Sequence, residues 1–220
     1  MDSVILVGGG GHAKQIIEII TAQKSYHIAG ITDNDPAKRK MLVSGVPVLG
    51  NDKILNTYFT KGIKRAFISL GSVDETGARI SLYNMLKEIG FTLINVVHSS
   101  VIISSSVTMG TGNALMPGSI INTHTSIGNN CIINTGTIVE HDCTIEDHVH
   151  IATGAKLAGG VTVQEGSHVG IGALIKQGVT IGRQVIVGAG ALVLEDIPDR
   201  VVCAGMPAKV IKYLGNTTIH

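Results

Sequence analysis

Aliphatic residues recur every six positions through the second half of the chain. From Val101 to Asp196 the sequence divides without a gap into sixteen hexads, among them CIINTG, TIVEHD and AKLAGG. The third residue of every hexad is Ile, Val, Leu or Met, and the first is small or β-branched in almost every case. If half of all residues were apolar, sixteen matches in register would arise by chance about once in 65,000 sequences.

A period of six does not fit an α-helix, which repeats every 3.6 residues, but it fits a short strand followed by a tight turn. Three hexads then close one triangular coil. Third positions point inward, first positions lie in the corners, and Gly and Asn occupy turns that need positive φ. The repeat therefore predicts a hexapeptide β-helix of a little over five coils, whereas a Gly-rich disordered tract would show no such period.

The first hundred residues follow a different pattern. Apolar runs at residues 4–7, 28–33, 67–71 and 92–97 have the length of strands. Helical patterns lie between them, one in which Ile16, Ile17 and Ile20 share a face and one at 79–90. Strands that alternate with helices predict a small parallel α/β layer. We therefore expect two domains, a Rossmann-like one at 1–97 and an all-β one at 98–220.

A glycine-rich loop joins the first strand to the first helix. Gly8, Gly10 and Ala13 match the pattern G-x-G-x-x-G/A, and Asp33 follows at the spacing of a ribose-binding acid. Residues 1–97 are too few for a full six-stranded dinucleotide-binding sheet, so we favour a smaller ligand whose phosphates meet the helix N-terminus, such as a sugar nucleotide. The alternative is a strand-to-helix turn that binds nothing.

Composition and charge narrow the function. The chain has 28 Gly, three Phe, four Tyr and no Trp, which disfavours an aromatic-rich sandwich or a base-stacking module. A net charge of +1 offers no footprint for nucleic acid or an anionic membrane. No apolar run approaches a membrane span and no signal peptide is recognised, so a cytoplasmic location is expected. The cysteines form no C-x-x-C pair, which suggests neither a disulfide nor a zinc site.

The repeat also singles out one histidine. Residues 18 apart stack on successive coils, about 4.8 Å from each other. His141 lies at a turn position with Thr123 one coil before it and Gly159 one coil after it, so an exposed imidazole adjoins a missing side chain. Histidine suits a general base at neutral pH. Asp142 is the favoured acid to orient it, with Glu140 as the alternative.

Two further histidines occupy second positions, which should face outward. His150 and His168 are 18 residues apart and should stack on each other. Asn134 shares their face and is placed to reach a sugar. His148 and His150 lack a third ligand at suitable spacing, so no metal is expected.

Several motifs together resemble one family. These are GGGGHAK at 8–14, TDND at 32–35, INTGTIVEHDC at 133–143, GAKLAGG at 154–160 and GMPAK at 205–209. They resemble the NeuD/PglD/PerB-type sugar acetyltransferases of bacterial glycan synthesis, a branch of the hexapeptide-repeat acyltransferases. The resemblance implies a left-handed β-helix and a homotrimer with active sites between neighbouring β-helices. It also implies acetyl transfer from acetyl-CoA to the amine of a nucleotide-linked 4-amino-4,6-dideoxy sugar.

The resemblance also implies roles for residues. The family motif has His followed by Asp or Glu where this chain has His141 and Asp142, the catalytic pair. Residues that match acetyl-CoA contacts are His150, Gly159, Ile171 and Ala189. Residues that match sugar-nucleotide contacts are Gly10, Gly11, His12, Asp33 and Asn34. Because the net charge is so small, phosphates should be held by backbone N–H groups and by local cations such as Lys209 and Lys212.

Three other functions stay open at this point. One is O-acetylation of a sialic acid or related sugar, for which a single histidine base also serves. Another is a noncatalytic sugar-nucleotide-binding module. A nicotinamide-dependent oxidoreductase is a more distant alternative.

Overall fold

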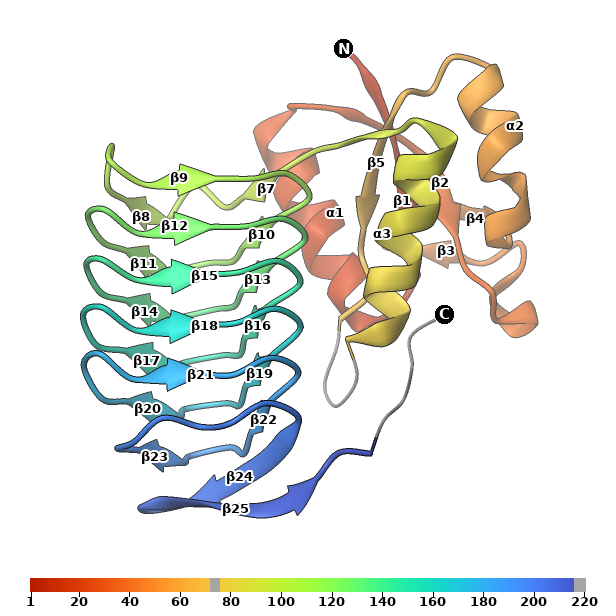
Figure 1. Ribbon diagram of the computed structural model, residues 1–220. Coiled ribbons are helices and arrows are strands. Elements are labelled where there is room, and N and C mark those ends of the chain that lie inside the picture. The colour runs from red at the N-terminus through yellow and green to blue at the C-terminus, as the bar shows by residue number, and fades with distance from the viewer. Residues whose placement is uncertain (72–75, 216–220) are drawn as a thin grey trace. The chain divides into compact units, whose positions relative to one another are not determined.

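The chain folds into two units, each with its own core (Figure 1). The computed structural model describes residues 1–71 and 76–215. One unit comprises residues 1–71 and 78–96, and the other contains the chain from Val97 onward. Across the described ranges, no helix is long and apolar enough to cross a membrane.

The first unit is built on a six-stranded sheet with the order β3-β4-β2-β1-β5-β6. The strand β1 runs parallel to its neighbours β2 and β5, as the alternation of strands and helices predicted, and only β3 is antiparallel to its partner. Val4, Ile5 and Leu6 of β1 are fully buried, as expected for a central parallel strand covered on both faces. The strands are β1 (Ser3–Val7), β2 (His27–Thr32), β3 (Leu42–Val43), β4 (Val46–Gly50), β5 (Arg65–Ile68) and β6 (Thr92–Leu93).

Two expectations for this unit were wrong. A six-stranded sheet does fit, because its edge strands β3 and β6 contain only two residues each. The run at 92–97 is not one strand. It divides into β6, which pairs with β5, and β7 (Val96–Val97), which begins a sheet of the second unit. One apolar run thus serves two cores, which its hydrophobicity alone does not reveal.

The predicted helices are confirmed. The helix α1 (Gly11–Gln23) buries Ile16, Ile17 and Ile20, and α3 (Gly77–Ile89) covers the second helical pattern. The sequence reasoning had not identified α2 (Leu55–Thr60) or the 3₁₀ turns η1 (Pro36–Lys38) and η2 (Asp52–Ile54).

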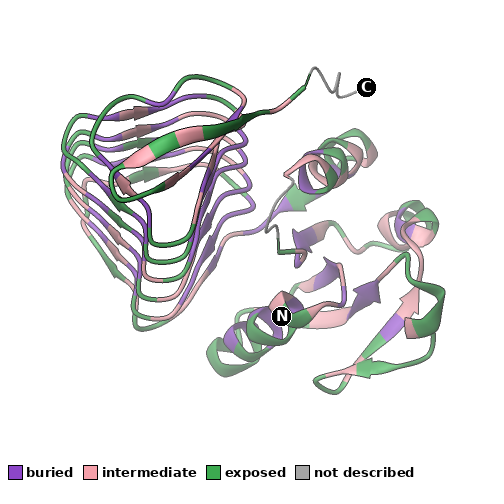
Figure 2. Ribbon diagram, turned by 90° about the horizontal axis from the view of Figure 1, so that it is seen from below, coloured by how far each residue is buried: buried purple, intermediate pink, exposed green. Residues whose placement is uncertain are grey.

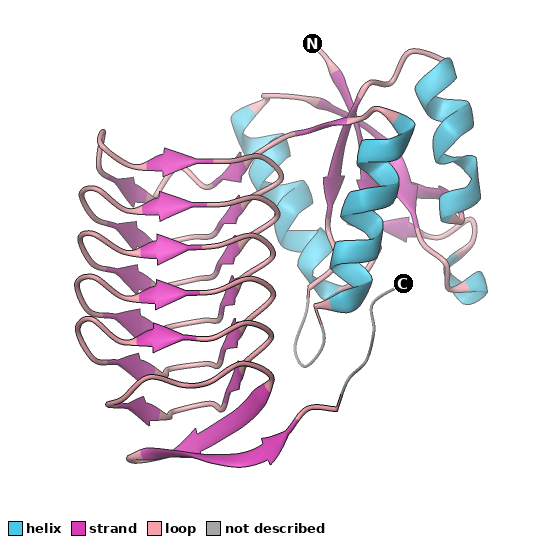
Figure 3. Ribbon diagram, in the orientation of Figure 1, coloured by secondary structure: helices cyan, strands magenta, loops and turns pink. Residues whose placement is uncertain are grey.

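The second unit is the predicted left-handed β-helix. The second and third residues of every hexad form a two-residue strand, and residues 18 apart pair in parallel, for example Ile132 with His150. Seen along its axis, each coil is a triangle with a buried interior (Figure 2). Three sheets form its sides (Figure 3), and their strands are parallel except the last strand of the first sheet, which runs antiparallel to its neighbour. Third positions fill the core except at the first coil, where Ile103 remains 39% exposed because no coil covers it.

The strands of the three sides, in chain order, repeat every third element. The first side holds β7, β10 (Ala114–Leu115), β13 (Ile132–Ile133), β16 (His150–Ile151), β19 (His168–Val169) and β22 (Ile186–Val187), followed by β24 (Val201–Gly205) and β25 (Ala208–Tyr213). The second holds β8 (Ile102–Ile103), β11 (Ile120–Ile121), β14 (Ile138–Val139), β17 (Lys156–Leu157), β20 (Leu174–Ile175) and β23 (Leu192–Val193). The third holds β9 (Thr108–Met109), β12 (Ser126–Ile127), β15 (Thr144–Ile145), β18 (Thr162–Val163) and β21 (Thr180–Ile181).

The turns explain the glycine content. The sixth residue of most hexads has positive φ, and at nine hexads it is Gly, from Gly112 to Gly190. Non-glycine residues take this conformation at a few turns, notably Asp142 at φ 60° and Gln184 at φ 53°. A residue with a Cβ is strained there, so a non-glycine at such a turn invites a functional explanation.

Candidate active site

His141 and Asp142 form a hydrogen-bonded pair on the turn after β14. The His141 Nδ1 lies 2.8 Å from Asp142 Oδ2, and the two side chains are 51% and 62% exposed. The left-handed conformation of Asp142 belongs to the same turn. A carboxylate on Nδ1 stabilises the tautomer that carries its hydrogen there, which leaves Nε2 as a free acceptor.

Gly159 provides the space that the imidazole occupies. A Cβ at Gly159 would lie only 2.6 Å from both Nε2 and Cε1 of His141, so no other residue fits without moving the ring. The next residue, Gly160, donates its N–H to the His141 carbonyl at 2.8 Å, which fixes the register of the two coils. The Nε2 edge of His141 therefore lies in the layer of the following coil.

Glu140, the alternative acid, is engaged elsewhere. Its Oε2 accepts a hydrogen bond from Asn122 Nδ2 at 3.0 Å. Asn122 is one coil away on the same column. The acid that the structure brings to the imidazole is Asp142.

His150 and His168 stack as expected, with ring centroids 4.8 Å apart and an interplanar angle of 79°. Their exposure does not follow the expectation for outward-facing second positions. They are only 6% and 9% exposed, because their rings are packed rather than solvated. Asn134 Nδ2 lies 3.2 Å from His150 Nε2, which links the two residues on this face.

Ile171 and Ala189 form a separate column on a different corner from His141. The Gly190 N–H bonds to the Ile171 carbonyl at 2.7 Å, which sets the register. Both side chains are exposed, Ile171 by 61%. His141 follows a strand of the second side and Ile171 a strand of the first, so one β-helix does not bring the two columns together.

The loop after β1 contains glycines of two kinds. Gly8 has φ +102°, and a Cβ there would lie 3.1 Å from the Leu70 backbone nitrogen. A Cβ at Gly9 would lie 3.2 Å from Asp33 Oδ2. The fold itself requires a very small residue at these two positions.

The next two glycines are not required by packing. A Cβ at Gly10 or Gly11 would meet no atom within 4 Å, and neither residue has positive φ. The helix α1 begins here with Gly10 as its N-cap, no capping side chain and no acid in its first turn. Its first N–H groups are therefore open to an anion.

His12 is neutral at physiological pH. Burial and the positive charge of Arg79 lower the pKa of His12 to about 4, which a hydrogen bond with Gln15 offsets in part. The Nε2 of His12 is buried without a hydrogen-bond partner among the described residues. His12 therefore adds no positive charge to this loop.

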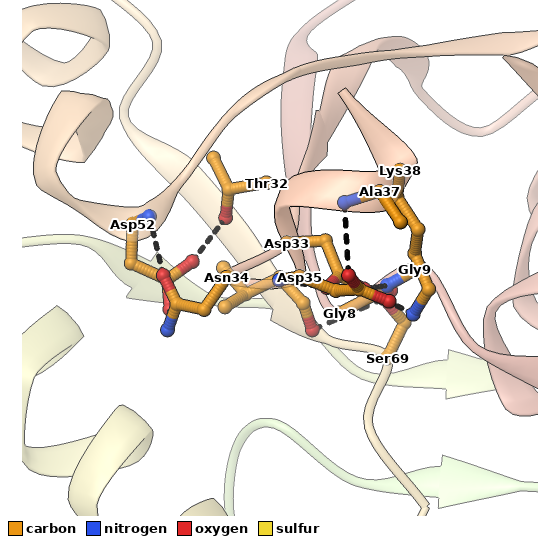
Figure 4. A network of polar contacts seen from close by, with 11 residues as sticks. Gly8, Gly9, Thr32, Asp33, Asn34, Asp35, Ala37, Lys38, Asp52 and Ser69 are labelled. Atoms are coloured by element: carbon orange, nitrogen blue, oxygen red, sulfur yellow. Dashed lines mark hydrogen bonds and ion pairs between the residues drawn. The ribbon is translucent and has the colours of Figure 1, made fainter. Parts of the chain in front are cut away.

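Asp33 ties the glycine loop to β2 (Figure 4). Its Oδ2 accepts hydrogen bonds from the Gly9 N–H at 2.7 Å and from Lys38 Nζ at 2.8 Å, and its Oδ1 accepts one from the Asp35 N–H. Burial opposes ionisation of Asp33, but these donors outweigh it and hold the pKa of the carboxyl below its usual value. Lys38, five residues away in the sequence, had not been identified as a partner.

Asn34 is held by a residue that the sequence reasoning missed. Asn34 Nδ2 donates to Asp52 Oδ2 at 2.6 Å, and the Asp52 N–H donates to Asn34 Oδ1 at 3.1 Å. Thr32 Oγ1 donates to the other Asp52 oxygen at 2.6 Å. No sequence spacing signals that Asp52 belongs here, because η2 reaches this point only through the sheet order.

The cysteines are internal. Cys131 and Cys143 occupy first positions and are 0% and 1% exposed, as predicted. Burial raises the pKa of the Cys143 thiol and raises that of Cys203 to about 11. Such thiols are poor acyl carriers, since the thiolate is the nucleophile. Within the described ranges, no group of three or more His, Cys, Asp or Glu could hold a metal ion.

Comparisons with known proteins agree with this architecture. The PglD N-terminal domain family matches residues 3–86, and the bacterial transferase hexapeptide (six repeats) family matches residues 124–159. The structure of PerB from Caulobacter crescentus in complex with CoA and GDP-perosamine is 41% identical, with a TM-score of 0.88 over 96% of this chain and 97% of that one.

Two other solved structures are similar over the same length. The acetyltransferase domain of PglB from Neisseria gonorrhoeae is 30% identical, with a TM-score of 0.87 over 96% of this chain and all of that one. WeeI from Acinetobacter baumannii is 25% identical, with a TM-score of 0.84 over 96% of this chain and all of that one. No curated protein gave a significant match.

Fold, repeat and similarity define an acyltransferase of the hexapeptide-repeat class. The chain belongs to the NeuD/PglD/PerB-type acetyltransferases within that class.

Proposed function

We propose that this protein transfers the acetyl group of acetyl-CoA to the amino group of a nucleotide-linked 4-amino-4,6-dideoxy sugar. The observation that carries the proposal is the exposed His141–Asp142 pair, an oriented base whose ring lies over Gly159. The similarity to a protein solved with CoA and GDP-perosamine supports a GDP-linked amino sugar as the acceptor.

The glycine loop is suited to the diphosphate of the sugar nucleotide. The protein has room for a side chain at Gly10 and at Gly11, yet both positions are glycine. The first N–H groups of α1, which no side chain caps, lie directly after them. The absence of a Cβ lets a phosphate approach the backbone closely. His12 lies at this loop, Asp33 fixes the loop, and Asn34 lies at the end of β2 where a nucleoside would extend.

Acetyl-CoA is proposed to lie along the β-helix, and the residues present fit its chemistry. Exposed Ile171 and Ala189 offer an apolar surface for pantetheine. Lys209 and Lys212 on β25 are exposed and offer positive charge for phosphates. His150 and Gly159 are assigned to the acetyl end.

The reaction needs no covalent intermediate on the protein. The amine nitrogen attacks the thioester carbonyl carbon while His141 Nε2 removes one of its protons. A new C–N bond forms and the C–S bond breaks, so that CoA leaves as a thiolate and recovers the proton from the His141 imidazolium. Asp142 stabilises that imidazolium through Nδ1, and Asn134, which lies beside His150, is assigned to the sugar.

A homotrimer would complete the site. The outward second positions of the side that contains β14 are apolar except at Lys156: Ile102, Ile120, Ile138, Lys156, Leu174 and Leu192. The equivalent positions of the side that contains β15 are all Thr or Ser. A neighbouring β-helix on the apolar side would cover it and would bring its Ile171 column toward this chain's His141.

The proposal is tested by thiol release from acetyl-CoA with UDP-, GDP- and dTDP-linked 4-amino sugars, alongside free and CMP-linked sialic acid. We expect turnover with an amino sugar and the highest kcat/KM with a GDP-linked one. Turnover with a sialic acid and with no amine would replace N-acetylation by O-acetylation. Absence of thiol release with every acceptor would favour the alternative of a noncatalytic sugar-nucleotide-binding module.

A further inference from the structure

We propose that the Gln177 side chain holds the acceptor amine opposite His141, by accepting a hydrogen bond from the amine hydrogen that the base does not remove. This role rests on the proposed function. It would make Gln177 a determinant of amine specificity in the same site.

Gln177 occupies the next layer of the His141 column. His141, Gly159 and Gln177 are separated by 18 residues each. Backbone bonds fix this register, because the Gly160 N–H bonds to the His141 carbonyl at 2.8 Å and the Gly178 N–H bonds to the Gly159 carbonyl at 3.0 Å. The three residues therefore lie one above another along the β-helix.

The position of the imidazole makes Gln177 its facing neighbour. A Cβ at Gly159 would lie 2.6 Å from His141 Nε2, so the ring extends over Gly159 in the direction of Gln177. Adjacent layers are about 4.8 Å apart. A nitrogen atom about 3 Å from Nε2 would lie between the two layers, within reach of the flexible Gln177 side chain.

The side chain is free to play this role. Gln177 is exposed, and no described residue makes a hydrogen bond or ion pair with its amide. Its neighbours on the turn are Lys176 and Gly178, and Gly178 has φ +73°, so the turn conformation does not depend on the glutamine.

An amine needs a second acceptor, whereas a hydroxyl does not. A primary amine that attacks the thioester carries two hydrogens, of which His141 removes one and the amide product keeps the other. The Gln177 Oε1 can accept the hydrogen that remains, which orients the lone pair toward the carbonyl carbon. A hydroxyl has a single hydrogen, and His141 takes it, so Gln177 favours amines.

The test compares three substitutions of Gln177 in the full-length protein, with steady-state thiol release from acetyl-CoA and the best amino-sugar acceptor at one alkaline pH. Gln177→Glu keeps an acceptor oxygen at the same reach. Gln177→Met keeps the length but loses the acceptor, and Gln177→Ala loses both. Gln164→Ala is the control, because Gln164 lies on a turn of another corner.

We expect kcat/KM for the amine to fall about tenfold in the Met and Ala variants, the size of one hydrogen bond, and to remain within about threefold of wild type in the Glu variant and the control. The KM for acetyl-CoA and the melting temperature should not change. Equal activity in all variants, or an equal loss in Glu, Met and Ala, would overturn the role of Gln177. Absence of turnover in the wild type would instead contradict the proposed function.

Discussion

The two candidate sites differ in the part of the chain that they use: the His141 site uses side chains, and the glycine loop uses the backbone. The His141 site places side chains on the turns of a repeating scaffold, where the backbone is already satisfied by bonds to the coils before and after. The glycine loop offers backbone N–H groups and has almost no side chains, and Asp33 at the end of β2 holds it in place. We therefore expect acetyl transfer at the His141 site to be lost when a single functional group is removed. We expect sugar-nucleotide binding at the glycine loop to be weakened when a side chain is added.

Replacing the base should have the largest effect. We expect His141→Asn to lower kcat about 10²- to 10⁴-fold, the usual contribution of general base catalysis, because Asn keeps a polar group but cannot take the proton. The affinity for acetyl-CoA, measured by calorimetry, should change little. Equal turnover of the variant and the wild type would exclude His141 as the base.

The two kinds of glycine should respond in opposite ways. Gly11→Ala should raise the KM for the sugar nucleotide about 10- to 100-fold through steric exclusion of phosphate, without lowering the melting temperature, because a Cβ there meets no atom within 4 Å. Gly8→Ala should instead destabilise the protein by about 1–3 kcal/mol, because φ +102° and the close Leu70 backbone oppose a Cβ. Chemical denaturation and steady-state kinetics separate the two effects. The distinction fails if both variants behave alike.

Acid should lower the stability of the α/β unit because His12 resists protonation in the folded state. The folded pKa of about 4 lies below the usual 6.5, so this contribution to stability is complete above pH 6.5 and is lost as the pH falls toward 4. The loss amounts to about 2 kcal/mol between pH 6.5 and pH 5. Denaturation of His12→Gln over this range should show a correspondingly smaller decrease than that of the wild type. Parallel pH curves would contradict the lowered pKa.

The smallest effect concerns the turn that carries the acid. Asp142 and Gln184 both have positive φ, which glycine adopts without strain. Asp142→Gly and Gln184→Gly should each raise the free energy of unfolding by about 0.5–1 kcal/mol. Only Asp142→Gly should lower kcat, because only it removes the His141 partner. Loss of activity in both variants would indicate a general effect of turn flexibility.

The difference between the β-helix and the α/β unit also explains which features could be predicted from the sequence. In the β-helix, each residue repeats an environment 18 positions away, so the strands, the corner position of Cys131 and the place of Gly159 beside His141 follow from the register. In the α/β unit, Asp52 meets Asn34 through a sheet order that no local pattern encodes. Burial of His150 and His168 was also missed, because the repeat specifies which way a side chain points and not what packs over it.

The chemical form of the product tests N-acetylation most directly. A GDP-linked 4-amino-4,6-dideoxy sugar labelled with ¹⁵N would be incubated with acetyl-CoA and the protein, and the product examined by NMR. N-acetylation predicts a ¹⁵N amide coupled to the transferred acetyl group, with one thiol released per amide formed. An acetyl ester on a sugar hydroxyl, or an unchanged amine beside full-length folded protein, would contradict it.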